Sequence, residues 1–259
     1  MNYEFIELKI NDGIAFIFLN RPTKHNALND EIRYELINAL ELVSNDEKIY
    51  SVILTGNGTS FCAGGDIEAM AKRLEVPAGE VAIKGWKRHQ EIQRMITLLH
   101  NMPKPIIAAV NGPAFGLGAD LALACDFIIA SINALFCWSY IDRAVIPDGG
   151  GMYFLPRRVG VSTAKDLIYS ARRVKPDEAL KIGLIDRCSE PDDLLSNAEK
   201  WANTYKDTAK PAFMLSKRIV NKSLESSLED IFSQSNMALG ICFSSVEHRI
   251  SVEKFLTKK

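Results

Sequence analysis

The most informative segment of this chain is a glycine loop that reads Ser60-Phe61-Cys62-Ala63-Gly64-Gly65-Asp66-Ile67. It follows the apolar run Val52-Ile53-Leu54, and a second loop, Gly116-Leu117-Gly118, follows the apolar run 106–110. Each loop precedes residues that can begin a helix. A strand, a glycine turn and a helix N-terminus together expose backbone N–H groups, which favour anions. One such loop can hold a phosphate, whereas two converging loops can hold one oxygen that becomes negative during a reaction.

The composition predicts a globular, reduced, cytoplasmic protein. The 259 residues suffice for one large domain or two small ones, and 47% of them are hydrophobic. Lys plus Arg number 31 against 32 for Asp plus Glu, a balance that argues against a nucleic-acid surface. No apolar run approaches a membrane span, and the N-terminus resembles no targeting peptide. The five cysteines form no CxxC pair, so we expect buried, reduced thiols.

Hydrophobic periodicity predicts a layered α/β core followed by a helical tail. The first twenty residues form a hairpin, and Asn29 caps a helix over residues 30–45. A helical pattern from Ile67 to His100 is interrupted at residues 77–79, and Trp86 belongs to the apolar face of its second part. Further strands are expected at 51–55, 106–110 and 126–130, and further helices at 117–124, 151–155, 162–170 and 175–182. We place the core at 1–191 and the helical region at 192–259, with a break near Lys210-Pro211.

Several common nucleotide, hydrolase and metal motifs are absent from the sequence. It contains no GxxxxGK[ST], no GxGxxG, no GxSxG and no HExxH. The four histidines show no metal-ligand spacing, so we expect no metal. The two glycine loops therefore favour an oxyanion site over a phosphate site.

In its motifs the chain resembles the crotonase superfamily, the enoyl-CoA hydratases and isomerases. The resemblance covers nearly the whole chain and rests on five segments in one order and spacing, which are more specific together than any one alone. These segments are residues 20–28 (Asn20-Arg21-Pro22 to Asn26-Ala27-Leu28), 60–67, 104–112, 126–130 and 146–150 (Ile146-Pro147-Asp148-Gly149-Gly150).

The resemblance implies a spiral of ββα units, with C-terminal helices that build homotrimers or hexamers formed by two trimers. It implies an acyl-CoA thioester as substrate, so coenzyme A is part of the substrate and no separate cofactor is expected. The backbone N–H groups at the positions of Gly65 and Leu117 then bind the thioester oxygen as it becomes an enolate. Leu replaces the family's usual glycine at 117, which a main-chain donor tolerates. The implied contacts with coenzyme A and the acyl group are Lys24, Ala27, Ala63, Asp66, Ile67, Tyr140, Phe255 and Lys258, the last two on a C-terminal helix that can reach across a subunit boundary.

The acid–base residues select the reaction on the enolate. Hydratases of this family use two glutamates, and the matching positions hold Asp120 and Tyr140, so the first carboxylate is shorter and the second is missing. Asp148 resembles the single acid of several isomerases in the superfamily, which moves a proton between C2 and C4 of an enoyl-CoA. One base suffices for that shuttle, because it takes a proton from one carbon and returns it to another. Phe136, Trp138 and Tyr140 are expected to supply the pocket wall or a hydrogen bond.

Other interpretations of the two aspartates remain open. Asp148 can be a helix cap or turn residue, and Asp120 can satisfy backbone donors near a helix N-terminus. A dehalogenase-like substitution with Asp148 as nucleophile requires a histidine base, and His89 does not align with one. The leading hypothesis is an enoyl-CoA isomerase that acts on fatty or ring acyl groups. The alternatives are a hydratase that uses Asp120 and a catalytically silent acyl-CoA-binding homologue.

Overall fold

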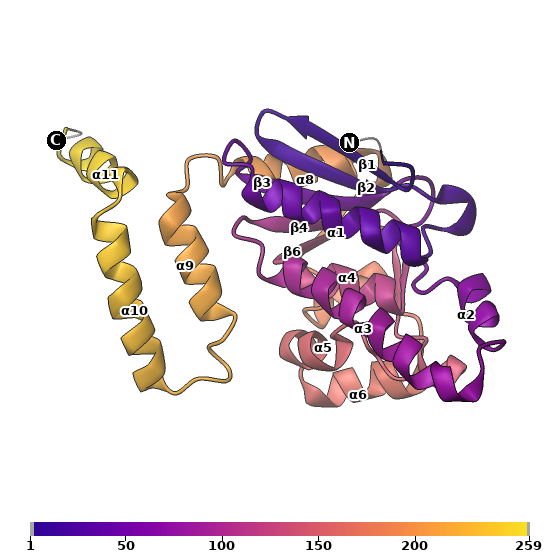
Figure 1. Cartoon of the computed structure of the whole chain (residues 1–259). Coiled ribbons are helices and arrows are strands. Elements are labelled where there is room, and N and C mark those ends of the chain that lie inside the picture. The colour runs from indigo at the N-terminus through magenta and orange to yellow at the C-terminus, as the bar shows by residue number, and fades with distance from the viewer. Residues whose placement is uncertain (1–2, 258–259) are drawn as a thin grey trace.

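The computed structural model describes residues 3–257, and a six-stranded sheet forms the centre of the molecule (Figure 1). The strand order is β1-β2-β3-β4-β6-β8, in which only the β1–β2 hairpin is antiparallel. The strands are β1 (Ile6–Asn11), β2 (Ile14–Leu19), β3 (Ser51–Gly56), β4 (Ile106–Val110), β6 (Phe127–Ser131) and β8 (Arg187–Ser189). The predicted α/β fold class and the predicted strands are confirmed.

Helices cover both faces of this sheet, which explains why its central strands are apolar at nearly every position. In β3, Val52 and Leu54 point into the larger core, whereas Ile53 points into the smaller core on the opposite face. The smaller core is closed by α8 (Leu194–Asn203). The larger core is covered by α1 (Asp30–Asn45), α3 (Ala78–His100), α4 (Leu117–Ala124), α5 (Gly151–Val159), α6 (Val161–Ser170) and α7 (Pro176–Lys181). The alternation follows from the two-residue period of a strand.

A second, two-stranded parallel sheet joins β5 (Pro113–Phe115) to β7 (Leu135–Cys137). The isolated bridge between Cys62 and Ala114 ties this small sheet to the segment that carries the first glycine loop. These strands and β8 have three residues each, too few for a periodic pattern in the sequence. The bridge between Cys62 and β5 nevertheless brings the two glycine loops together.

Local signals in the sequence set several element boundaries. The Asn29 side chain accepts a hydrogen bond from the N–H of Ile32 at 3.1 Å, which confirms the predicted cap of α1. The predicted interruption is also confirmed, because α2 (Ile67–Arg73) ends before Pro77 and α3 begins at residue 78. Three short 3-10 helices occupy Pro22–Lys24, Ile141–Arg143 and Pro191–Asp193.

Two expectations are corrected by the structure, and a third is confirmed. Trp86 does not belong to a buried face: it is 61% exposed, because the N-terminal half of α3 extends beyond the sheet (Figure 1). The expected break near Lys210-Pro211 is confirmed, because α8 ends at Asn203 and α9 (Lys210–Val220) begins at Lys210, with Pro211 in its first turn, where the missing N–H has no helical partner to lose. Cys62, Cys125 and Cys137 are buried as expected, whereas Cys188 is exposed and Cys242 partly exposed.

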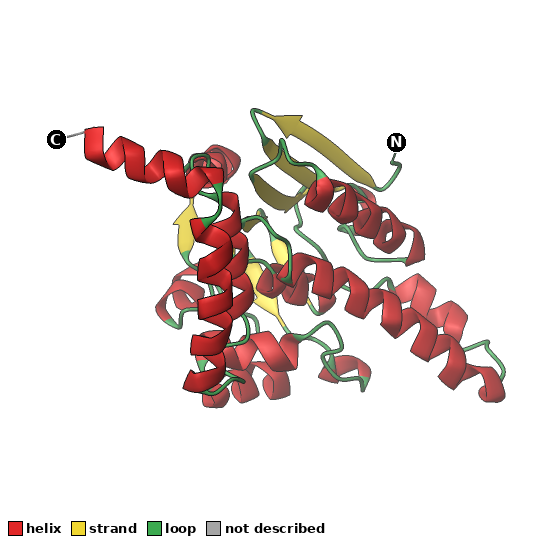
Figure 2. Ribbon diagram, turned by 60° about the vertical axis from the view of Figure 1, so that its left-hand side comes forward, coloured by secondary structure: helices red, strands yellow, loops and turns green. Residues whose placement is uncertain are grey.

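The last three helices extend away from the sheet (Figures 1 and 2). α9 and α10 (Leu228–Phe243) form an antiparallel pair, and α11 (Val246–Thr257) follows after a sharp turn. A capping box between Ser227 and Asp230 begins α10. Helix α8 packs against the sheet, so the helices that extend away from it begin with α9. The expected functional division at residue 192 stays a prediction. No helix within residues 3–257 is long and apolar enough to cross a membrane.

Candidate active site

The two glycine loops lie against each other because their segments exchange backbone hydrogen bonds. The N–H of Cys62 donates to the carbonyl of Pro113 at 3.0 Å, and the N–H of Phe115 donates to the carbonyl of Cys62 at 2.9 Å. A Cβ on Gly118 would lie 2.1 Å from that same Cys62 oxygen. Glycine at 118 is therefore required for the close approach of α4 to the first loop.

Gly65 and Leu117 present two backbone donors to one pocket. Both residues line it, and within residues 3–257 neither N–H donates a hydrogen bond to the protein. Leu117 is the first residue of α4, so its N–H has no partner inside the helix. The loops meet closely: a Cβ built on Gly64 would stand 3.4 Å from the Leu117 nitrogen. Two unpaired donors that open onto one pocket can stabilise a single oxyanion.

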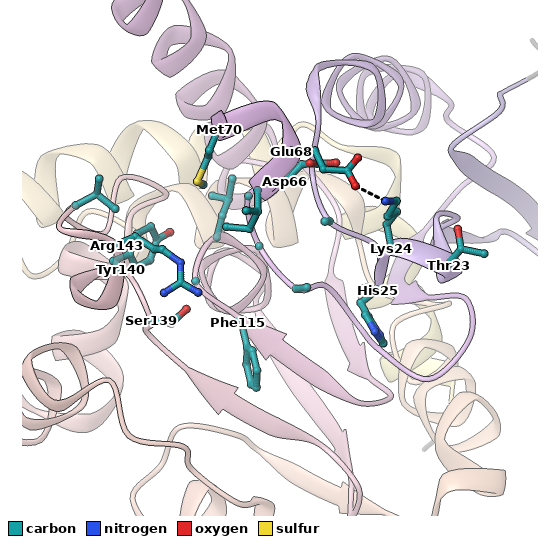
Figure 3. Close-up of a pocket in the computed structure, with 18 residues that line it drawn as sticks. Thr23, Lys24, His25, Asp66, Glu68, Met70, Phe115, Ser139, Tyr140 and Arg143 are labelled. Carbon is teal, nitrogen blue, oxygen red and sulfur yellow. Dashed lines mark hydrogen bonds and ion pairs between the residues drawn. The ribbon is translucent and has the colours of Figure 1, made fainter. Parts of the chain in front are cut away.

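The pocket has a volume of about 370 Å³ and runs from Thr23 and His25 at one end to Tyr140 and Arg143 at the other (Figure 3). The sequence-predicted residues that line it are Lys24, Ala27, Ala63, Asp66, Ile67 and Tyr140. Phe255 does not line it: the side chain lies on α11 and is 70% exposed. Lys258 lies outside the described residues. Six of the eight predicted binding residues thus surround one cavity.

Two charged residues of the pocket already have protein partners. The Asp66 carboxylate accepts from the Ala69 N–H at 3.1 Å, which caps α2, and pairs with the Arg21 guanidinium at 2.9 Å. Burial opposes its ionisation, but these two contacts outweigh burial and lower the pKa of Asp66. Lys24 forms an ion pair with Glu68 at the edge of the pocket (Figure 3). Asp66 therefore shapes the loop, and an anion that binds Lys24 has to compete with Glu68.

Asp120 is fully buried beneath the pocket rather than exposed in it. Its carboxylate accepts from the Tyr140 hydroxyl at 2.6 Å and from the Trp138 Nε1–H at 3.0 Å. Burial raises the pKa of Asp120 to about 7, although these hydrogen bonds partly offset that effect. Its donors are mainly side chains, contrary to the interpretation of Asp120 as a residue that only satisfies backbone groups. Tyr140 both lines the pocket and contacts Asp120, so its hydroxyl can relay a proton between Asp120 and a bound molecule.

Asp148 lies on the loop before α5, and its side chain remains 30% exposed. It does not cap that helix, because Gly150 occupies the N-cap position and α5 has no side-chain cap. Its carboxylate instead lies 2.9 Å from the His89 Nε2 atom. The charge of Asp148 also raises the pKa of Asp120, after burial, so the two carboxyl groups are near one another. Asp148 is thus the more accessible of the two carboxylates.

His89 is the residue of this site that the sequence analysis dismissed. The two partners are 59 positions apart (148 − 89) and belong to different elements, so no motif joins them. A weak signal exists in α3, where His89 shares one helical face with Ile92 and Ile96, both buried. A histidine on that stripe is directed toward the protein body, here toward Asp148.

Of the three aromatic residues expected to supply the pocket wall or a hydrogen bond, Tyr140 does both and Trp138 supplies a hydrogen bond. Trp138 and Phe136 are buried in the core and do not line the pocket. Trp138 instead donates its Nε1–H to the buried Asp120 carboxylate at 3.0 Å. Within residues 3–257, no group of three or more His, Cys, Asp or Glu residues is arranged to hold a metal ion.

Comparisons with known proteins identify relatives of this chain in sequence and in fold. The sequence profile of the family described as enoyl-CoA hydratase/isomerase matches residues 9–259. The crotonyl-CoA hydratase of Syntrophomonas wolfei is 35% identical over 260 residues, covering 100% of this chain and 97% of that protein. The 1,2-epoxyphenylacetyl-CoA isomerase of Escherichia coli is 31% identical over 258 residues, covering 99% and 97%. The crystal structure of an enoyl-CoA hydratase/isomerase from Cupriavidus metallidurans superposes with a TM-score of 0.92 at 33% identity, covering 100% and 96%.

Proposed function

The chain belongs to the enoyl-CoA hydratase/isomerase family, and from that premise we propose that it shifts the double bond of an enoyl-CoA thioester. The crotonase-like fold expected from the sequence is confirmed by the structural match. In the proposal, the Gly65 and Leu117 N–H groups bind the thioester oxygen, and Asp148 moves the proton. Coenzyme A occupies the pocket that Lys24, Ala27, Ala63 and Ile67 line.

The observation that carries the proposal is the different accessibility of the two carboxylates. Asp120 is enclosed, with both oxygens bonded to aromatic side chains, whereas Asp148 keeps part of its surface exposed beside the pocket. A base that takes a proton from carbon has to touch that carbon's hydrogen. We expect the partly exposed Asp148 to reach that hydrogen, although it is not itself among the residues that line the pocket, whereas the fully buried Asp120 lies behind Tyr140.

The proposed steps balance with a single base. Asp148 takes a proton from C2 of a 3-enoyl-CoA, and the electron pair of that C–H bond moves onto the thioester oxygen to form a dienolate. The two N–H donors stabilise the negative oxygen, which in related systems is worth about 3 kcal/mol per donor. The dienolate then takes the same proton at C4, which leaves a 2-enoyl-CoA and the ionised Asp148. His89 holds the carboxylate in place through its Nε2 contact.

A matched pair of substrates tests this proposal. We expect the wild-type protein to convert a 3-enoyl-CoA to the conjugated 2-enoyl-CoA, measured by the rise in its ultraviolet absorbance. Asp148→Asn should abolish conversion but retain binding of a saturated acyl-CoA measured by calorimetry. The exposed Asp142→Asn substitution serves as control and should leave both unchanged. Full conversion by the Asp148→Asn protein would remove this residue from the mechanism, and binding without turnover by the wild type would favour a silent homologue.

Hydration is the second candidate, and the Asp120–Tyr140 contact favours it. A carboxyl group whose pKa is raised to about 7 by burial can both give and take a proton near neutral pH, here through the Tyr140 hydroxyl. The relative from Syntrophomonas wolfei carries the name of a hydratase. Hydration would consume the conjugated absorbance of a 2-enoyl-CoA and would disappear in Tyr140→Phe, which should leave double-bond shifting by Asp148 intact.

We also propose that a second and a third copy of this chain cover the C-terminal helices, giving a trimer or a pair of trimers. In α10, Phe232, Met237, Ile241 and Phe243 are each more than half exposed, a large apolar surface for a single chain. Sedimentation should report a trimer or hexamer, and Met237→Asp with Ile241→Asp should yield a monomer. The five unpaired cysteines support a reducing, cytoplasmic location.

A further inference from the structure

A second cleft lies beside the candidate active site, between the end of α2 and the first half of α3. Its volume is about 490 Å³. Apolar groups line much of it, including the exposed Trp86 together with Val76 and Val81. Arg73, Lys84 and Arg88 add positive charge to the same lining. The cleft therefore combines apolar walls with cations.

Two of these cations have no counter-ion in the part of the chain that the structure describes. Lys84 pairs with Glu80 at 2.6 Å, but the half-buried Arg73 and Arg88 form no ion pair or side-chain hydrogen bond within residues 3–257. Burial, and then the neighbouring charge of Arg88, lower the pKa of Arg73. Two like charges held together at partial burial are unfavourable until an anion joins them.

The acids that reach Arg73 are already engaged. The charges of Asp30 and Asp66 act on it, yet Asp30 bonds to Arg33 and Asp66 pairs with Arg21 at 2.9 Å. The positive charge of the cleft is thus not neutralised by the surrounding residues.

Two elements relate the cleft to the active site. Along α2, Ile67 and Met70 line the pocket, and Arg73, one turn further on the same face, lines the cleft. Along α3, His89 lines the cleft and contacts Asp148 at 2.9 Å. An acyl chain that extends past Met70 and Asp148 would therefore approach the two arginines.

We propose that the substrate is an enoyl-CoA whose acyl group carries a free carboxylate at the end far from the thioester, and that this carboxylate binds Arg73 and Arg88. The acyl carbons lie along the apolar wall that includes Trp86, and the far carboxylate accepts hydrogen bonds from the guanidinium groups. Planar guanidinium groups match a carboxylate better than a point charge does. This inference names the substrate of the proposed isomerase and rests on that function for the reaction, but its binding test does not require turnover.

The test compares two saturated, unreactive CoA thioesters of equal chain length, one ending in a methyl group and one in a carboxylate. Calorimetry should show that the wild-type protein binds the carboxylate-ended ester about 10- to 100-fold more tightly, the range expected for hydrogen bonds to a charged group. Arg73→Met and Arg88→Met should each remove most of that preference while leaving the affinity for the methyl-ended ester within about twofold. That second affinity also shows that the variants remain folded. Lys87→Met, an exposed change on the same helix, should alter neither affinity.

Three outcomes separate this inference from the proposed function. An Arg-dependent preference for the carboxylate-ended ester without conversion of the unsaturated forms would retain the inference and remove the isomerase. Conversion of enoyl esters with preference for the methyl-ended series would retain the isomerase and overturn the inference. A preference that survives the combined Arg73→Met and Arg88→Met substitution would place the carboxylate elsewhere and also overturn it.

Discussion

Replacement of Asp120 by Asn should remove a defined part of the pH dependence of folding. Folding moves the pKa of Asp120 from 3.8 to about 7, chiefly because the side chain leaves water. This shift of roughly three units corresponds to about 4 kcal/mol, at about 1.4 kcal/mol per unit. Asn has nearly the same shape: its oxygen can accept from Trp138, and its amide can donate to the Tyr140 oxygen.

The sign of the effect follows from which state releases its proton first. The unfolded chain loses the Asp120 proton near the ordinary pKa of 3.8, whereas the folded chain holds it until about pH 7. Stability from this group is therefore complete below about pH 4, falls as the pH rises toward about 7 and is constant above. Asn carries no such proton, so the variant should lack this decline.

Urea unfolding at several pH values and one fixed protein concentration measures the effect, since self-association shifts apparent stability. Between about pH 5 and pH 7, we expect the wild-type protein to lose about 2 kcal/mol relative to Asp120→Asn. The exposed Asp142→Asn change is the surface control and should follow the wild type. Parallel curves for wild type and Asp120→Asn across this range would show that Asp120 ionises normally and would refute the reasoning.

Three further predictions concern the oxyanion donors, the partner of Asp148 and the packing of the loops. Leu117→Pro removes one donor at a helix position that tolerates proline, so kcat should fall about 100-fold or more while calorimetric binding of acyl-CoA persists; unchanged turnover would exclude this donor. His89→Ala should lower kcat about tenfold with little change in KM, and His89→Gln, which can still bond Asp148, should recover most of it; equal losses in both variants would indicate a role other than positioning. Gly118→Ala places a Cβ against the Cys62 carbonyl, so thermal unfolding should show a loss of about 2 kcal/mol or more, and an unchanged midpoint would contradict this close approach of the two loops.

Features that depend on local sequence were predictable. Asn29 caps α1 through its own side chain, and Pro77 marks the interruption between α2 and α3. Each of these signals lies within a few residues of the element that it determines. The assignment of Gly65 and Leu117 as oxyanion donors came from the family resemblance, and both residues line one pocket.

Features that depend on pairing across the chain were not predictable. The contact between His89 and Asp148 requires α3 to pass beside the loop before α5, and no periodic pattern specifies that distance. The exposure of Trp86 depends on the extension of α3 beyond the sheet at that point, and Trp86 also precedes the buried Met95 by two and a half helical turns, which places it on the other side of the helix. The burial of Asp120 likewise depends on Trp138, whose position comes after the short strand β7.

The Asp120 side chain supports the loop that carries Asp148, so a substitution that shortens Asp120 also affects Asp148. A Cβ on Gly149 would lie 2.8 Å from an Asp120 oxygen, and one on Gly151 would lie 2.4 Å from the other. The loop that carries Asp148 therefore wraps directly around the Asp120 carboxyl group. Asp120→Ala would leave space beneath this loop and displace Asp148, so activity would fall whichever residue is the base. Only Asn keeps that volume and both hydrogen bonds, so an Asp120→Asn protein that still shifts double bonds would assign the proton transfer to Asp148 and the support of the loop to Asp120.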